Sequence, residues 1–281
     1  MLWVFVVCLL GGVWVQPAWA VSFPVRAALL FNSTTGKVLY QLNPHLPIPP
    51  ASLTKVMTLY LALDQVAKGR IALTKKVRIS ALAARTGGSS MHLRRGERVP
   101  FAKLLIGTAV PSGNDAAMAV AETVSPNIQR FVQMMNARAK ALKMKRTVFC
   151  NPTGLPAKGQ MSTAYDMLKL ALAYMRRHPT ALDFHSVATF SHGGRVLTTT
   201  NPLLGAVCGV NGLKTGWTHA SGYNIIVTAK RGKTRLVCVI MGGKNRIGRD
   251  MTARKLIEAG FKAQDSPKKV LEILEARSQR R

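Results

Sequence analysis

Apolar and polar positions alternate in two short stretches near the start of the chain. Residues 25–31 and 37–41 are predicted as β-strands, and the polar run Asn-Ser-Thr-Thr-Gly between them as a turn. A proline-rich loop follows. Residues 52–67 then carry apolar side chains around most of a helical circumference, which predicts a helix that is buried on most of its sides.

The middle of the chain has the apolar spacing that is typical of helices. Helices are predicted at 101–109, 115–123 and 128–142. After a loop that begins with Asn-Pro-Thr-Gly, Ser162 or Thr163 is expected to cap a further helix.

The last third of the chain changes character. Strands are predicted at 187–190, 195–200, 223–229 and 236–241, before a helix at 249–260. Strands at both chain ends most simply join one antiparallel sheet with the helical middle inserted, so the predicted fold class is α+β. Cys238 is expected in the core, and the charged tail at 264–281 is expected to be a loosely held helix.

The first twenty residues differ from all others because they contain no Asp, Glu, Lys or Arg. Positions 2–15 are almost wholly apolar, and Ala18-Trp19-Ala20 fits a small-x-small cleavage pattern, which predicts a secretory signal cleaved after Ala20. The alternative is an uncleaved membrane anchor, although the apolar run is shorter than the ~20 residues that a span needs. We expect a signal peptide at 1–20, one domain at 21–263 and a basic tail at 264–281.

The formal net charge is +29, from 40 Lys and Arg against 11 Asp and Glu. Such a chain is attracted to anionic polymers. We expect secretion across the inner membrane and a periplasmic or wall-associated location, where anionic wall polymers or the membrane surface take the place of nucleic acid. No nucleic-acid-binding motif occurs, so no specific nucleic-acid partner is predicted.

Cysteines do not organise the predicted fold. Beyond the expected signal only Cys150, Cys208 and Cys238 remain, so one pair at most could form a disulfide, and the sequence does not say which.

Three short motifs occur in a meaningful order: Ser-x-x-Lys at 52–55, Ser-x-Asn at 112–114 and Lys-Thr-Gly at 214–216. This trio is typical of penicillin-binding proteins and class A β-lactamases. Each motif alone is weak, because 266–269 and 125–127 repeat the first two patterns. Only the first copies lie on a buried helix, in a helix-linking turn and next to a predicted strand, and we rate that combination as specific.

The chemistry of the first motif supports a catalytic role. A serine hydroxyl needs a nearby base to become a good nucleophile. Residues three apart on a helix share a face, which places Lys55 beside Ser52. Burial disfavours an ammonium group and lowers the pKa of a lysine toward a value useful for a base.

From about 25 to 261, the chain resembles the low-molecular-mass D-alanyl-D-alanine carboxypeptidases. The resemblance rests on Pro-x-x-Ala-Ser-Leu-Thr-Lys around Ser52, Ser-Gly-Asn-Asp-Ala from Ser112 and Gly-Leu-Lys-Thr-Gly around Lys214, together with Ala-Ser-Gly-Tyr-Asn and Met-Gly-Gly further on. It implies a β-lactamase/penicillin-binding-protein-like fold. It also implies an enzyme that removes the terminal D-Ala from peptidoglycan stem peptides and is acylated by β-lactam antibiotics.

The resemblance also implies a role for each motif residue. Ser52 attacks the D-Ala-D-Ala carbonyl, Lys55 takes the serine proton, and Ser112 relays a proton to the leaving amine. Substrate-binding roles fall on six further residues: Asn114, Lys214, Thr215, Gly216, Trp217 and Arg249. In that scheme Asn114 binds the substrate backbone, the backbone N–H groups of Ser52 and Trp217 form the oxyanion hole, and Thr215 meets the terminal carboxylate. No metal and no cofactor is implied.

Two features depart from the family pattern. Trp217 stands where several relatives carry histidine, which is expected to alter substrate preference. Many longer relatives add a β-rich domain and an amphipathic anchor, both expected to be absent here because few residues follow Phe261.

Missing motifs disfavour two other classes of enzyme. No Gly-x-Ser-x-Gly and no His-x-x-x-His pair occurs, which disfavours a Ser-His-Asp hydrolase and a metalloenzyme. The alternatives that remain are a D,D-endopeptidase or a β-lactamase on the same fold, and a non-catalytic wall-binding protein. Against the β-lactamase, residues 151–166 contain no glutamate, and their one acid, Asp166, is expected to help cap a helix.

Overall fold

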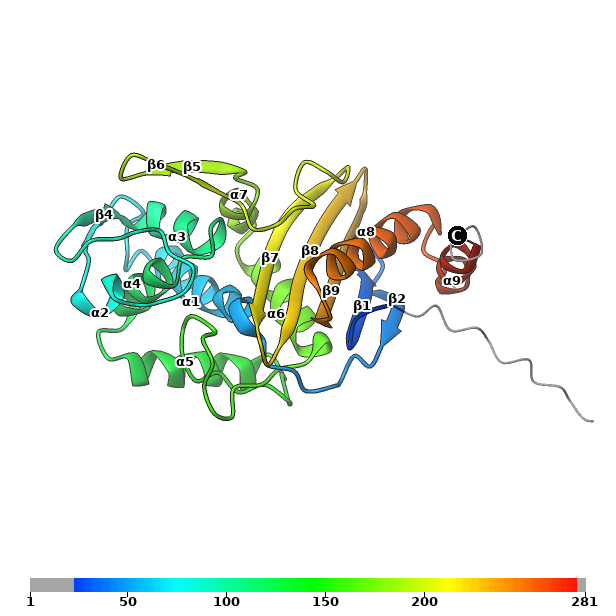
Figure 1. Ribbon diagram of the computed structural model, residues 1–281, viewed down its shortest axis with the longest axis horizontal. Coiled ribbons are helices and arrows are strands. Elements are labelled where there is room, and N and C mark those ends of the chain that lie inside the picture. Colours follow the sequence, from blue (N-terminus) through cyan, green and yellow to red (C-terminus); the bar gives the residue numbers. More distant parts are fainter. Residues whose placement is uncertain (1–22, 277–281) are drawn as a thin grey trace, which may run out of the picture.

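Strands from the two ends of the chain form one sheet in the computed structural model, which describes residues 23–276 (Figure 1). The sheet is antiparallel, in the order β2 (Lys37–Leu42), β1 (Ala27–Asn32), β9 (Thr234–Gly243), β8 (Gly222–Arg231) and β7 (Val210–Thr218). This confirms the predicted α+β class with an antiparallel sheet built from both chain ends. The predicted signal peptide at 1–20 lies outside the described residues.

Most helices precede the last three strands of the sheet. They are α1 (Lys55–Ala67), α2 (Ala81–Ala84), α3 (Phe101–Ala109), α4 (Asn114–Val124), α5 (Ile128–Ala141), α6 (Ala164–Arg177) and α7 (Ala181–His185). Two hairpins accompany them, β3 (Lys76–Arg78) with β4 (Arg98–Pro100) and β5 (Thr189–His192) with β6 (Arg195–Thr198). The chain then returns to the sheet and continues into α8 (Arg246–Lys262) and α9 (Pro267–Ala276).

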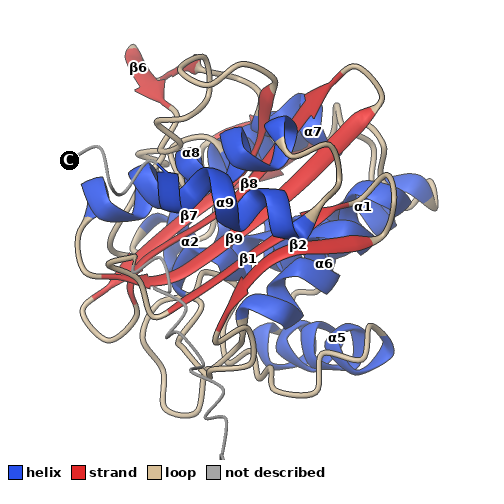
Figure 2. Ribbon diagram, turned by 90° about the vertical axis from the view of Figure 1, so that its right-hand side faces the viewer, coloured by secondary structure: helices blue, strands red, loops and turns tan. Residues whose placement is uncertain are grey.

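Helices lie on both faces of the sheet (Figure 2), and the sheet separates two apolar cores. Successive side chains of a strand point to opposite faces. Accordingly Leu29 and Val239 join the core of α1 to α6, whereas Leu30 and Cys238 pack under α8 and α9. The central strands are thus buried on both sides, and Cys238 is confirmed as a core residue.

Four details differ from the sequence-based expectations. The α-helix starts at Lys55, and Ser52 lies in a preceding 3₁₀ turn, η1 (Ala51–Thr54). Residues 189–198 form a separate hairpin turning at two glycines with positive φ, so these two strands do not join the main sheet. The Lys-Thr-Gly motif lies within β7 rather than before a strand, a strand that sequence reasoning missed.

The fourth difference concerns the tail. Its helix α9 is packed rather than loosely held, because Val270 and Leu274 are buried in the core beneath α8. The three cysteines of the described residues are free. Within residues 23–276, no helix combines the length and apolar character that a bilayer crossing requires.

Candidate active site

Ser52 lies in the 3₁₀ turn η1 that leads into α1. Ala51, just before it, has a φ of +48°. Such a left-handed conformation costs roughly 1–3 kcal/mol and persists only where the surroundings enforce it. The loop at 151–154 packs directly against it, since a Cβ added at Gly154 would lie 1.9 Å from the Ala51 carbonyl oxygen. The serine hydroxyl is therefore presented from a closely packed, locally strained backbone.

Lys55 is fully buried and makes three polar contacts. Its Nζ lies 2.8 Å from Ser52 Oγ, 2.6 Å from Asn114 Oδ1 and 2.7 Å from the Thr153 carbonyl oxygen. Burial holds the pKa of Lys55 well below its usual range, and the charge of Lys214 lowers it further, while Asp115 opposes both effects. A neutral amine has two N–H groups and one lone pair. With both N–H groups donated to carbonyl oxygens, the lone pair remains for the Ser52 hydroxyl.

The second motif forms the opposite wall. Ser112 has a φ of +63°, is buried and lines the cleft. Asn114 does not reach the cleft surface, because its Oδ1 faces Lys55 and its Nδ2 donates to the Gly87 carbonyl oxygen at 2.6 Å. Asn114 therefore positions the Lys55 amine and the loop at Gly87. The contact of Asn114 with the substrate backbone stays a prediction.

The third motif brings β7 against the serine turn. A Cβ at Gly216 would lie 2.9 Å from the Ser52 backbone nitrogen and 3.1 Å from that of Leu53, so only glycine permits this approach. Lys214 is buried and its Nζ donates to the Thr215 carbonyl oxygen at 3.0 Å. Burial lowers the pKa of Lys214 to about 7, and the charge of Arg249 adds to the effect.

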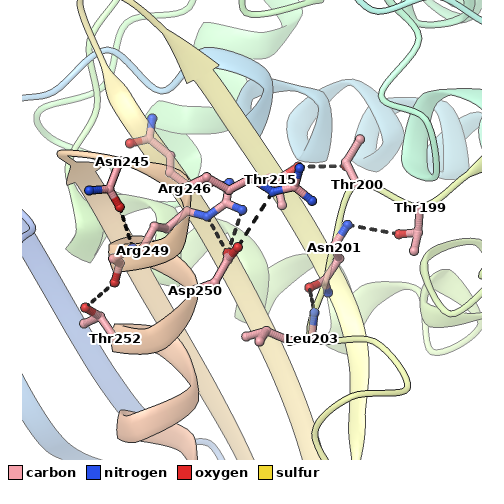
Figure 3. Close-up of polar contacts among 12 residues, drawn as sticks. Thr199, Thr200, Asn201, Leu203, Thr215, Asn245, Arg246, Arg249, Asp250 and Thr252 are labelled. Atoms are coloured by element: carbon pink, nitrogen blue, oxygen red, sulfur yellow. Dashed lines mark hydrogen bonds and ion pairs between the residues drawn. The ribbon is translucent and has the colours of Figure 1, made fainter.

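Hydroxyl and guanidinium groups gather at one end of the cleft (Figure 3). Thr215 Oγ1 donates to Thr200 Oγ1 at 2.7 Å. Arg249 is buried, and its guanidinium binds the Asp250 carboxylate through Nε at 2.7 Å and Nη2 at 2.6 Å. Arg246, one helical turn earlier, lies on the cleft surface with its Nε 3.9 Å from the same carboxylate. This end of the cleft is suited to binding a carboxylate.

Arg246 and Thr200 were missed by sequence reasoning. The signal for Arg246 was its spacing of three residues from Arg249, which places both on one helix face. Thr200 carried no comparable signal, because it was the last residue of a predicted strand.

The active-site cleft has a volume of about 390 Å³. It is lined by Ser52, Ser89, Ser112, Thr198, Thr199, Thr200, Thr215, Gly216, Trp217, Tyr223, Arg246 and Arg249. Of the nine predicted site residues, Lys55, Asn114 and Lys214 are buried behind this surface, and the other six line it. The three motifs are thus brought together from η1 and α1, from the turn before α4, and from β7.

Trp217 stands at the rim of the cleft and is 48% exposed. Its indole ring packs 4.9 Å from the His219 ring and 5.8 Å from the Tyr223 ring, measured between centroids. The side chain therefore presents an aromatic surface to any group that leaves the cleft on this side.

No carboxylate or histidine belongs to the described residues that line the cleft. Thr163 caps α6 by accepting the Asp166 backbone N–H at 3.1 Å, as predicted for one of the two candidate caps. The Asp166 carboxylate was expected to help cap this helix, but it accepts bonds from Arg146 N–H and Thr147 Oγ1 instead, both at 2.9 Å. Within residues 23–276 there is also no cluster of metal-ligating side chains.

The fold and the three motifs define a low-molecular-mass penicillin-binding protein. The chain belongs to the D-alanyl-D-alanine carboxypeptidase family, whose sequence model matches residues 16–245. It is 36% identical to the D-alanyl-D-alanine carboxypeptidase DacF of Bacillus subtilis over 84% of this chain and 62% of that one. It is 32% identical to a D-alanyl-D-alanine endopeptidase of Pseudomonas aeruginosa, over 83% of this chain and 77% of the relative.

A solved structure with the same fold is penicillin-binding protein D2 of Listeria monocytogenes in its ampicillin-bound form. It has a TM-score of 0.78 and 30% identity, and covers 85% of this chain and 98% of that one. The chain spans about three fifths of the length of the curated carboxypeptidases it matches. The predicted family and fold are therefore confirmed.

Proposed function

We propose that the chain is a serine-type D-Ala-D-Ala carboxypeptidase that removes the terminal D-Ala from peptidoglycan stem peptides through an acyl-enzyme. The observation that carries this proposal is the 2.8 Å contact between Lys55 Nζ and Ser52 Oγ in a cleft whose far end holds Thr215 and Arg249. A nucleophile, its base and a seat for a terminal carboxylate then lie in one cleft.

In the first step, neutral Lys55 takes the proton of Ser52 as Oγ attacks the carbonyl carbon of the penultimate D-Ala. The backbone N–H groups of Ser52 and Trp217 stabilise the oxyanion, an arrangement supported by the close approach of β7 to the serine turn at Gly216. Lys214, buried behind this surface, adds positive potential where negative charge develops.

In the second step, the C–N bond breaks and the amine of the terminal D-Ala leaves with a proton relayed through Ser112. The carboxylate of that D-Ala is held by the Thr215 hydroxyl, with Arg249 and Arg246 behind it. Water then attacks the ester carbonyl, and Ser52 regains its proton. β-Lactam antibiotics acylate Ser52 by the same attack.

The proposed partners follow from this chemistry and from charge. They are peptidoglycan stem peptides, β-lactams and, through the net charge of +29, anionic wall polymers or the membrane surface. Family members act on peptidoglycan, which supports a location outside the cytoplasm. We place the enzyme in the periplasm or at the cell wall, after secretion across the inner membrane.

The test is hydrolysis of a stem pentapeptide ending in D-Ala-D-Ala, with released D-Ala and shortened peptide measured by mass spectrometry. Ser52→Ala is expected to lower turnover by at least ~1,000-fold, because it removes the covalent nucleophile. Ser266→Ala is the matched control, since Ser266 begins the second Ser-x-x-Lys sequence and is not among the residues that line the cleft. Undiminished release of D-Ala by Ser52→Ala would overturn the proposal.

A D,D-endopeptidase is the second candidate, supported by the Pseudomonas aeruginosa relative. It would use the same residues to cut a peptide cross-link instead of a terminal D-Ala. Products of intact cross-linked peptides distinguish the two, because only an endopeptidase releases two separate stem peptides. A β-lactamase is disfavoured by the cleft lining, which offers no carboxylate to activate water.

A further inference from the structure

A second cavity of about 440 Å³ is lined by His92, Arg94, Glu97, His192, Gly193 and Arg195. We call it the side cavity. Its lining comes from the β5–β6 hairpin and from the segment that leads into β4. Figure 1 shows this hairpin lying over the helical region. None of the three catalytic motifs contributes to it.

Two chain segments connect the side cavity with the active-site cleft. Ser89 lines the cleft and His92, three residues later, lines the side cavity. On the facing wall, Thr198 lines the cleft and Arg195, three residues earlier on β6, lines the side cavity. Three residues of a strand span roughly 10 Å. Thr198 is two residues before Thr200, which binds the Thr215 hydroxyl, so the β6 segment links the side cavity to the carboxylate end of the cleft.

The walls of the side cavity are fixed to the catalytic framework. The carboxylate of Asp115, next to the Ser-x-Asn motif, accepts bonds from Ser90 Oγ at 2.7 Å and from the Leu93 N–H at 3.0 Å. On the hairpin, His192 Nε2 lies 3.2 Å from Glu97 Oε1. The two walls are thus tied to each other and to α4, so the distance from the cleft is set by the fold.

The charge in the side cavity favours an anion. Glu97 is engaged by His192 and also accepts the Arg94 backbone N–H at 3.0 Å. The Arg94 and Arg195 side chains are exposed, and no carboxylate of residues 23–276 forms an ion pair with either guanidinium. Guanidinium groups bind carboxylates through paired, charge-assisted hydrogen bonds.

We propose that the side cavity is an anion subsite on the leaving-group side of the scissile bond, where Arg94 and Arg195 bind a second carboxylate of the substrate. The inference rests on the catalytic residues of the proposed function and specifies the leaving group for its second candidate, the D,D-endopeptidase. The preferred leaving residue would place its own carboxylate at Thr215 and carry a side chain that ends in a further carboxylate on the order of 10 Å away. A terminal D-Ala has only a methyl side chain, so the subsite would favour cleavage in which a larger residue leaves.

The test uses two synthetic peptides with the same acyl part. In both, the leaving residue is a D-glutamate whose side chain is extended by an amide-linked aminocaproic acid, with the end group either a free carboxylate or its amide. We expect wild-type enzyme to prefer the free carboxylate by about tenfold in kcat/KM, a factor typical of one charge-assisted contact. The double variant Arg94→Gln, Arg195→Gln is expected to lose this preference, and the exposed control Arg78→Gln on β3 to retain it.

A wild-type preference near one, or a preference that survives in the double variant, would overturn the subsite. Binding to Ser52→Ala, measured by calorimetry, separates this result from failure of the proposed function. If the wild type hydrolyses neither these peptides nor a stem pentapeptide ending in D-Ala-D-Ala, the proposed function fails. Tighter binding of the carboxylate peptide that the arginine substitutions abolish still supports the subsite in that case. Equal binding of the two peptides to Ser52→Ala counts against it.

Discussion

Lys55 Nζ and the Thr153 carbonyl oxygen lie 2.7 Å apart, although the two residues are separated by 98 positions in the sequence. Together with Asn114 Oδ1, this oxygen orients the two N–H groups of a neutral lysine. The basicity of Lys55 toward Ser52 therefore depends on backbone supplied by a distant loop, and the loop in turn depends on Gly154 to fit against Ala51.

Lys55→Arg tests the base directly. A guanidinium stays protonated near neutral pH and cannot accept the serine proton. We expect the rate of labelling by a fluorescent penicillin to fall by about 100- to 10,000-fold, the range that general-base catalysis typically contributes. Lys269→Arg, in the second Ser-x-x-Lys sequence, is the control and should label at the wild-type rate. Rapid labelling of Lys55→Arg would show that another group removes the proton.

Amidating the C-terminus of the peptide substrate tests the carboxylate seat. Loss of the negative charge removes its interaction with Thr215 and the two arginines of α8, so kcat/KM should fall at least ~10-fold, or ~1.4 kcal/mol. In Arg246→Gln this discrimination should shrink, whereas Arg254→Gln, an exposed position of the same helix, should keep it. Equal rates on acid and amide would indicate a different pocket for the substrate end.

Lys214 is expected to be needed for catalysis and, at the same time, to lower the stability of the folded state. Burial lowers its pKa from 10.5 to about 7, so the unfolded chain binds this proton more tightly than the folded chain does. The folded state is therefore destabilised to the full extent below pH 7, and this loss of stability disappears as the pH rises toward 10.5. The shift corresponds to a cost of up to about 5 kcal/mol.

Lys214→Met should therefore raise the free energy of unfolding, and it should do so more at about pH 6 than at about pH 9. The same variant should be nearly inactive. Denaturant unfolding at the two pH values is the measurement, with Lys230→Met on the exposed end of β8 as the control. A stability change that is the same at both pH values would mean that Lys214 does not titrate between them.

β-Lactam acylation should inhibit the protein and leave it modified for minutes or longer. No carboxylate of the described residues lines the cleft, and the one acid of the 151–166 region, Asp166, binds Arg146 and Thr147 instead. Water therefore lacks a dedicated base next to the ester of Ser52. Intact-protein mass spectrometry after mixing with penicillin should reveal a persistent penicilloyl adduct. An adduct that vanishes within seconds while penicillin is consumed catalytically would favour a β-lactamase.

Binding to wall material should depend on salt. The net charge of +29 attracts anionic polymers, and dissolved salt screens this attraction over ~10 Å at 0.1 M. Sedimentation with purified sacculi should bring down most of the Ser52→Ala protein at low salt and little at high salt. Binding that ignores salt would assign recognition to specific contacts and not to the overall charge.

The sequence predicted the parts of the fold whose apolar spacing is regular. Helix α3 was predicted with its observed bounds, and β1, β8 and β9 lay within a few residues of theirs, because buried faces impose their period directly on the side chains. Strand β7 was missed because Asn211, Gly212, Lys214, Thr215 and Gly216 interrupt any apolar pattern. Its pairing with β8 and its approach to Ser52 are tertiary effects that no local pattern encodes.

The candidate active site was likewise predictable only in part. Serine, lysine and threonine side chains within motifs are visible in the sequence, and six of the nine predicted residues line the cleft. The carbonyl oxygens of Thr153 and Gly87, which hold Lys55 and Asn114 in place, belong to the backbone and have no side-chain signature. The side cavity likewise joins residues of two segments that are distant in sequence and meet only in the folded chain.

The pairing of β1 with β9 determines when the active site can assemble during folding. Ala27 pairs with Met241, so the sheet that carries β7 closes only after nearly the whole chain is available. Contacts between such distant segments have a high entropic cost and form slowly. The nucleophile near the beginning of the chain and the Lys-Thr-Gly strand near its end therefore meet late. An unfinished chain carries Ser52 but lacks the Lys-Thr-Gly strand, so the active site cannot assemble before nearly the whole chain is available.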